Sequence, residues 1–240
     1  MTRIDAYGMD FRELNRTLRN CGDDAEIQNC LGQRFIAVGM EKRKITIHGV
    51  PGNALGAYLD GATVEVFGNA QDAVGDTMNA GTIIVRGNIG DTAGYAMRGG
   101  RIYVRGNAGY RTGIHMKAYE DKLPVLVIGG RTGSFLGEYQ AGGVIVVLGL
   151  WESSRPIVSN FPCTGMHGGK LFLRSDCGSI SFPEQVAARP AMPDDMSEIT
   201  EYLREFCALF DFDFETVISA PYTVVTPESK NPYQQMYVAN

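Results

Sequence analysis

Short runs of β-branched and other apolar residues recur along the middle of the chain, and glycines separate them. Six of these runs occupy residues 45–48, 64–67, 83–86, 102–105, 126–128 and 144–148. Runs of this length and composition are typical of β-strands. In the second run Glu65 and Phe67 alternate with Val64 and Val66, which predicts a sheet with one buried face and one face that is exposed or covered.

Glycine recurs at a fixed distance after these runs. One column, with a period of 19 residues, contains Gly49, Gly68, Gly87 and Gly106, and a second contains Gly56, Gly75, Gly94 and Gly113. After an insertion the same register resumes at Gly130 and Gly137. The recurring unit is G-x-x-G-x-x-x-G, and a repeat of this kind predicts a chain built from stacked, similar units.

The length of the repeat limits the architecture. Nineteen residues are too few for a strand, a helix and a second strand, which need roughly 30. They are more than the roughly 8–12 residues per strand of an antiparallel meander. One coil per repeat fits, with glycines at corners that need a positive φ or a close backbone approach. We therefore expect an all-β solenoid, a right-handed parallel β-helix of about six to seven coils.

The two ends of the chain carry helical patterns. Residues 10–19 place Phe11, Leu14 and Leu18 at helical spacing after Asp10, a candidate N-cap. Residues 194–210 contain an apolar stripe formed by Met196, Ile199, Leu203, Phe206 and Phe210. Because a solenoid must shield its terminal coils, we expect helical capping segments at both ends.

Residues 49–85, 86–109 and 136–149 resemble, in the order and spacing of their glycines, the GXGXG repeat domain at the C-terminus of the large (alpha) subunit of glutamate synthase. The chain is similar to a stand-alone form of that domain. Together with the limits of the repeat, the resemblance divides one structural unit into three parts. These are an N-terminal capping segment (1–44), the GXGXG β-helix (45–175), and a C-terminal helix and tail packed on it (176–240).

The resemblance implies a function without catalysis. In glutamate synthase the domain packs between a glutamine-hydrolysing domain and a synthase domain with FMN and an iron–sulfur cluster, and it supplies no catalytic residue. We therefore expect a structural subunit of a glutamate-synthase-like oxidoreductase complex in nitrogen metabolism. Its expected partners are glutaminase-type and FMN-binding synthase-type subunits, which would hold the FMN and the iron–sulfur cluster. A homo-oligomer is also compatible with the pattern, and the product, glutamate or another amino compound, stays open.

Two alternatives stay open. The same repeat occurs in a subunit of formylmethanofuran dehydrogenase, so the motif specifies a fold more closely than a pathway. The other alternative is a self-sufficient β-helix enzyme that acts on polysaccharide. Such enzymes usually present paired acidic groups on an exposed sheet, whereas the strands here carry few carboxylates, chiefly Glu65.

Composition limits the partners and the cellular compartment that we expect for the protein. Glycine contributes 30 of 240 residues, against a usual share of about 7%, and the net charge of −5 argues against nucleic acid as a partner. No run of about 18 apolar residues predicts a membrane span, and the first residues lack the apolar segment of a signal peptide. The five cysteines form no CxxC pair, which favours reduced, buried thiols and a cytoplasmic protein.

Candidate chemistry is sparse. His48 ends a strand and is expected at a corner or surface, His115 lies in the insertion, and His167 is the best candidate for a functional histidine. A glycine-rich turn is the alternative role for the stretch around His167. Cys163 lies four residues before it, so a nucleophile–base pair is conceivable. A glutaminase of this family begins with cysteine, whereas this sequence begins MTR, so that activity is not expected.

Two other patterns invite a functional interpretation. The string GGRTG at 129–133 lacks the Lys and Ser or Thr of a phosphate-binding loop, and the repeat already explains its glycines. Arg86 and Arg105 stand one repeat apart and should lie side by side, where like charges repel. Local carboxylates or an acidic partner surface should neutralise them. We assign no catalytic, cofactor-binding or metal-binding residue to this chain.

The coil period is interrupted at residues 115–124 and 150–169. The second stretch contains Trp151 and Arg155, and these residue types are favoured at protein interfaces. We expect the two loops to lie against the glutaminase and FMN subunits. The alternative is that Trp151 packs under the C-terminal helix as part of the core.

Overall fold

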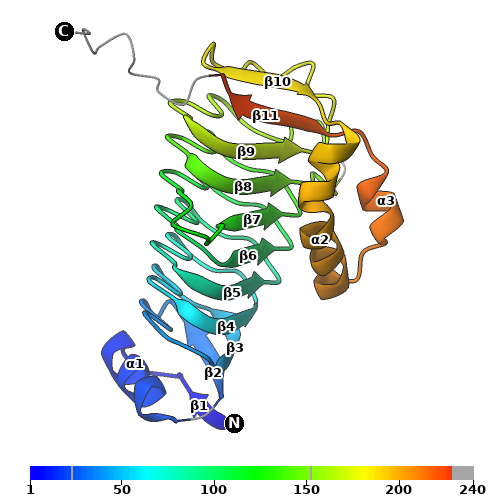
Figure 1. Cartoon of the computed structure of the whole chain (residues 1–240). Coiled ribbons are helices and arrows are strands. Elements are labelled where there is room, and N and C mark those ends of the chain that lie inside the picture. The colour runs from blue at the N-terminus through cyan, green and yellow to red at the C-terminus, as the bar shows by residue number, and fades with distance from the viewer. Residues whose placement is uncertain (23, 152, 229–240) are drawn as a thin grey trace, which may run out of the picture.

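Parallel strands stacked along one axis form most of the molecule (Figure 1). The computed structural model describes residues 1–22, 24–151 and 153–228. The strands of the stack are β1 (Thr2–Asp5), β2 (Ala25–Leu31), β3 (Lys44–Val50), β4 (Asp60–Phe67), β5 (Ala80–Val85), β6 (Arg101–Val104), β7 (Val125–Ile128), β8 (Ala141–Val147) and β9 (Gly168–Leu173). Each pairs in parallel with the next, which confirms the predicted parallel solenoid.

The register of the sheet equals the glycine period. Ile45 pairs with Val64, and Val64 pairs in turn with Ile83, so each strand is offset from the next by one repeat. Ile102 pairs with Leu126 because the insertion between them is looped out of the coil. These side chains point inward and are fully buried. With their counterparts from the other coils they form one continuous core along the axis.

The solenoid begins before the glycine columns do. Residues 1–44 contribute β1 and β2 as well as the expected helix, α1 (Phe11–Asn20). The Asp10 carboxylate accepts hydrogen bonds from two N–H groups of the first turn of α1, as an N-cap should. Leu14 and Leu18 of this helix are fully buried. The two additional strands explain why the solenoid has more turns than the six to seven expected from the glycines.

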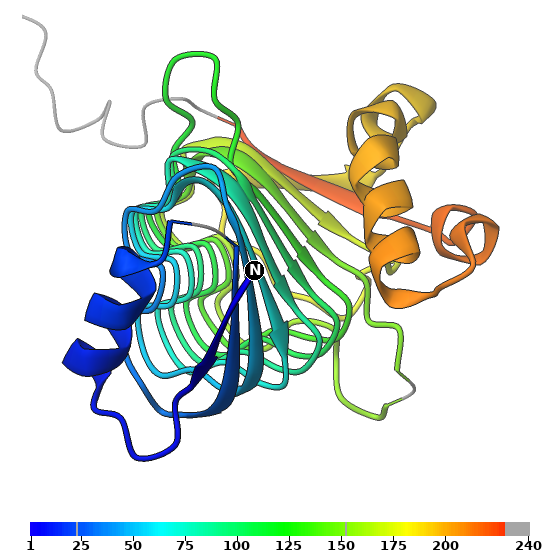
Figure 2. The ribbon, with the colours of Figure 1, turned by 90° about the horizontal axis from the view of Figure 1, so that it is seen from below.

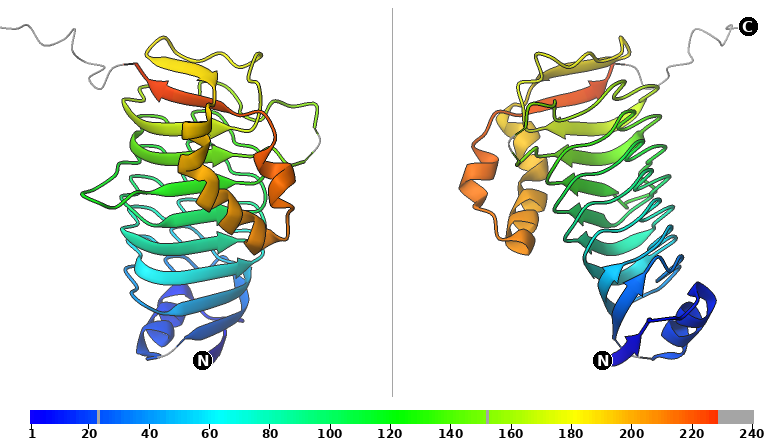
Figure 3. Two further views of the ribbon diagram at one scale, coloured as in Figure 1. Left: turned by 45° about the vertical axis from the view of Figure 1, so that its right-hand side comes forward. Right: turned by 180° about the vertical axis from the view of Figure 1, so that it is seen from behind.

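The C-terminal helices lie on a face of the sheet. The expected helix is present as α2 (Pro193–Phe210), and with the short α3 (Phe214–Ile218) it covers the outer side of the later strands (Figure 3). The end of the solenoid is instead closed by β11 (Thr223–Pro227), antiparallel to β9, and by β10 (Val186–Pro190), antiparallel to β11. The view along the axis in Figure 2 places α1 and α2 on different sides of the coils.

A second apolar core explains the position of α2. Tyr103, Val127 and Phe172 point outward from the sheet and are fully buried. Leu203 and Phe206 of α2 belong to the same cluster. An apolar outer face of this kind must be removed from water, so the helix is used to cover it and is not available to cap the end.

Candidate interaction surface

One row of outward side chains crosses the sheet, and half-way along it the side chains change from polar to mainly apolar. In register order it consists of Glu26, Thr46, Glu65, Ile84, Tyr103, Val127, Val146 and Phe172. The members from Ile84 onward belong to the core beneath α2. The polar members lie on β2–β4, where none of the described helices covers the sheet (Figure 3). We call five outward side chains of these three strands the open face, namely Glu26, Thr46, His48, Glu65 and Phe67.

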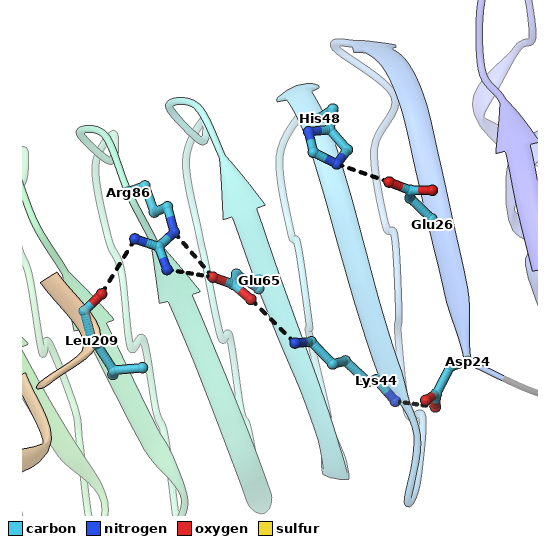
Figure 4. Close-up of polar contacts among 7 residues, drawn as sticks. All are labelled: Asp24, Glu26, Lys44, His48, Glu65, Arg86 and Leu209. Carbon is cyan, nitrogen blue, oxygen red and sulfur yellow. Dashed lines mark hydrogen bonds and ion pairs between the residues drawn. The ribbon is translucent and has the colours of Figure 1, made fainter. Parts of the chain in front are cut away.

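A charge network occupies the boundary between the open face and α2 (Figure 4). The buried carboxylate of Glu65 accepts hydrogen bonds from Nε and Nη2 of Arg86, at 2.9 and 2.7 Å. Nζ of Lys44 lies 3.4 Å from the same carboxylate. Nη1 of Arg86 donates to the carbonyl oxygen of Leu209, at 3.2 Å, near the C-terminal end of α2. The expectation of a local carboxylate is therefore confirmed for Arg86.

Among the described residues, aromatic rings and not a carboxylate lie against Arg105. Its guanidinium lies 5.2 Å from the ring centroid of Trp151 and 5.8 Å from that of Phe212. A guanidinium over an aromatic face is attracted by the ring quadrupole. The two arginines of the predicted ladder thus have different partners, since Arg86 pairs with Glu65 and Arg105 stacks on rings.

His48 is a surface residue of the open face. Its Nε2 lies 3.2 Å from Oε1 of Glu26, and its ring stacks on Phe67 at a centroid distance of 5.0 Å. The side chain of His48 is 37% exposed, and Phe67 is 42% exposed. The surface role expected for His48 is confirmed. Among the described residues no group of three His, Cys, Asp or Glu side chains could hold a metal ion.

The structure does not bring Cys163 and His167 together as a nucleophile–base pair. Cys163 is fully buried, and burial raises the pKa of its thiol to about 12. Such a thiol carries very little thiolate at neutral pH and is a poor nucleophile. His167 is half-buried, and its Nδ1 lies 3.1 Å from the carbonyl oxygen of Gly165. That contact fits the alternative role in a glycine-rich turn.

The remaining histidine belongs to an aromatic group at a coil corner. His115 is exposed and stacks on Tyr139 at a centroid distance of 5.1 Å, with the edge of Tyr95 at 6.0 Å. The five cysteines, all within the described residues, are free, and four of them are buried. The expected burial is thus confirmed for these four cysteines.

The two loops leave the coil stack at different corners (Figure 2). Trp151 packs against Phe212, which follows α2, at a centroid distance of 5.6 Å, and is 37% exposed. Its ring therefore contacts the C-terminal helical segment, as the alternative expected, but it is half-exposed and does not belong to the core. The second interruption is shorter than 150–169, because Val158 already pairs with Thr132 of the preceding coil. That the loops contact partner subunits stays a prediction.

The sequence interpretation missed the contacts that fasten α2 to the sheet. The hydroxyl of Tyr103 donates to Glu205 at 2.5 Å, and Nη1 of Arg101 donates to the same carboxylate at 2.6 Å. Nη2 of Arg101 donates to Glu201 at 3.2 Å. Burial and the neighbouring Glu205 raise the pKa of Tyr103, so it stays a donor. Glu201 and Glu205 stand four residues apart, so they lie on the same side of α2. This spacing could have indicated from the sequence that one side of the helix binds a basic or hydroxyl-bearing strand.

Comparisons with known proteins agree with the repeat. The profile of a family described as "GXGXG motif" matches residues 10–228. "Uncharacterized protein MJ1350" of Methanocaldococcus jannaschii is 44% identical, over 98% of this chain and 95% of that protein. One chain of the crystal structure of the formyltransferase/hydrolase complex (FhcABCD) from Methylorubrum extorquens, in complex with methylofuran, superposes with a TM-score of 0.51. It is 21% identical, over 75% of this chain and 71% of that chain, a likeness that concerns the fold.

None of the helices in the part of the chain that the structure describes has the length and apolar character of a membrane span.

Proposed function

The chain belongs to the GXGXG motif family, and we propose that it is a non-catalytic assembly subunit of a larger multi-subunit enzyme. The division of the outer face of the sheet carries this proposal. The apolar half is covered by α2 and α3, whereas the half on β2–β4 presents charges and a half-exposed ring without a cover among the described helices. A rigid stack of coils with a mixed polar and aromatic face suits docking between other subunits better than chemistry.

The sequence resemblance supports a glutamate-synthase-like complex. In that case glutaminase-type and FMN-binding synthase-type subunits would be the partners, and they would hold the FMN and the iron–sulfur cluster. This chain would hold no cofactor. The free thiols agree with a reducing compartment, and we place the subunit in the cytoplasm.

A second candidate is a formyl-transferring complex of the formylmethanofuran dehydrogenase kind. Its support is the solved structure, because that neighbour belongs to a formyltransferase/hydrolase complex bound to methylofuran. The relative from Methanocaldococcus jannaschii carries no described activity. The comparisons therefore favour this candidate over the first.

Co-purification from the native host tests the assembly role and separates the two candidates. We expect a tagged chain to bring down other subunits in fixed stoichiometry. Glutaminase-type and flavin-containing partners would support the first candidate, and formyl-transferring or hydrolase subunits the second. The chain purified alone should hydrolyse no glutamine and show no visible flavin band. Glutamine turnover or stoichiometric flavin in the isolated chain would contradict the non-catalytic role.

A further inference from the structure

A cavity of about 430 Å³ lies where the coil period breaks after β8. On one side it is lined by the coil corner with Asn107, Arg131 and Thr132. On the other side it is lined by Ser153, Arg155, Pro156 and Ser159. The break explains the cavity. Thr132 is joined to Val158, further along the chain than one repeat, so the extra residues of this coil bulge outward and do not stack on the corner below. Its volume is in the range of small-molecule sites, roughly 300–1,000 Å³.

The lining of the cavity is cationic and rich in donors. Two guanidinium groups, of Arg131 and Arg155, line it, and no carboxylate does so among the described residues. The hydroxyls of Ser153 and Ser159 are also present. The side-chain oxygen of Asn107 accepts the N–H of Arg131 at 2.9 Å, which leaves the amide NH₂ of Asn107 as a donor.

The two cavity arginines differ from those arginines of the fold that lie in ion pairs. Arg86, Arg101 and Arg189 each lie against a carboxylate. Within the part of the chain that the structure describes, neither Arg131 nor Arg155 has an ion pair or a ring beneath its guanidinium. In a protein with a net charge of −5, two such arginines give the described lining of this cavity an excess of positive charge, which attracts anions.

A buried hydroxyl provides the second observation. Thr132 lines the cavity and is 4% exposed, and its Oγ1 is buried with no hydrogen-bond partner among the described residues. A buried polar group without a partner is unfavourable and calls for an explanation. An oxygen of a bound anion would accept this hydroxyl proton together with the N–H groups of the arginines.

We propose that this cavity binds the phosphate group of a small ligand. Two arginine forks, hydroxyl donors and an amide converge on it, and this number of donors suits the several oxygens of a phosphate better than the two of a carboxylate. The site is separate from the open face and does not depend on the proposed assembly role.

Calorimetric titration of the isolated chain with inorganic phosphate tests the proposal, with acetate and glutamate as carboxylate ligands. We expect saturable binding of phosphate, weaker binding of both carboxylates, and a loss of phosphate affinity of about tenfold or more in Arg131→Gln and in Arg155→Gln. The matched control is Arg98→Gln, which removes an exposed arginine outside the cavity and should leave the affinity unchanged.

Thr132→Val separates binding from folding. The change removes the hydroxyl that lacks a partner, so it should weaken phosphate binding without lowering the melting temperature of the unliganded protein. The proposal would be overturned by phosphate that does not bind saturably, by tighter binding of a carboxylate than of phosphate, or by an equal loss in Arg98→Gln. A lower melting temperature of unliganded Thr132→Val would show that the hydroxyl has a structural partner, against the proposal.

Discussion

Positive φ angles recur at three alternating positions of each coil corner. In one glycine-bearing corner they are found at Thr92, Gly94 and Ala96, with values of 56°, 68° and 49°. A positive φ therefore does not by itself require glycine here. What distinguishes the middle position is its direction, because a Cβ at Gly94 would lie 2.9 Å from Cδ1 of Leu126 in the core. Close approach to the Leu126 side chain of β7 is what requires glycine at this position, and the left-handed backbone conformation adds to the requirement.

Gly94→Val should be strongly destabilising. The change adds strain at a positive φ and overpacks the core against Leu126, which together should lower the free energy of unfolding by about 3 kcal/mol. Ala96→Gly is the control, because it lies at the same corner with a positive φ and should change stability by less than about 1 kcal/mol. Denaturant unfolding measures both. An unchanged stability of Gly94→Val would contradict the stacked-corner account.

The same corner geometry explains the position of Cys163, which the sequence offered as a candidate nucleophile. It has a φ of 60° and is fully buried, and its N–H donates to the carbonyl of Leu136, as that of Gly113 does to Ala93 in an earlier coil. Cys163 thus takes the middle corner position that glycine fills in other coils. Spacing to His167 suggested chemistry, whereas the repeat register, once carried past the insertion, assigns a packing role.

At the scale of elements, the strands could be predicted from the sequence where glycine marks the corners. The first coils were missed because Ala37 occupies the middle corner position, with a φ of 63°, and Cys30 pairs with Gly49 in the sheet. The corner geometry of the coils therefore continues into the N-terminal segment, although glycine is absent from these two positions. The position of α2 could not be predicted either, because its apolar stripe shows that it packs but not on which surface.

The N-terminal anchor of α2 makes a prediction about acid stability. The Asp195 carboxylate accepts hydrogen bonds from Arg189 at 2.6 and 2.9 Å and from the N–H of Met192 at 2.8 Å. These contacts, chiefly those with Arg189, lower the pKa of Asp195 to about 2, from about 3.9 in an unfolded chain. A lowered carboxyl pKa stabilises the fold above about pH 4, and the contribution is lost as the pH falls through about 2.

Asp195→Asn should therefore remove part of the acid dependence. Its stability should be lower than that of the parent at neutral pH, and the difference should shrink as the pH falls from about 4 to about 2. Thermal unfolding across this pH range measures it. A difference that is independent of pH would show that the charge of Asp195 does not anchor α2.

At the scale of the whole molecule, the solenoid is a rod whose outer sheet face is polar on β2–β4 and apolar on the later strands. The alternation of Glu65 and Phe67 with valines indicated two faces, but the sequence alone did not show that polar and apolar residues separate along the stack. That separation appears only when the register aligns Glu26 and Thr46 with Glu65 in one row. The open face is thus a property of the assembled sheet and not of any one strand.

Loss of partners on truncating the open face is the most direct test of the assembly role. In the tagged complex, Phe67→Ala and His48→Ala remove the stacked, half-exposed pair of the open face, and truncating such residues at an interface commonly costs about 1–4 kcal/mol of binding. Tyr110→Ala, which removes an exposed ring at a coil corner, is the matched control. We expect the two open-face variants to stay folded and lose the co-purifying subunits, while Tyr110→Ala keeps them. Retention of partners at the parent stoichiometry in both open-face variants would contradict the account.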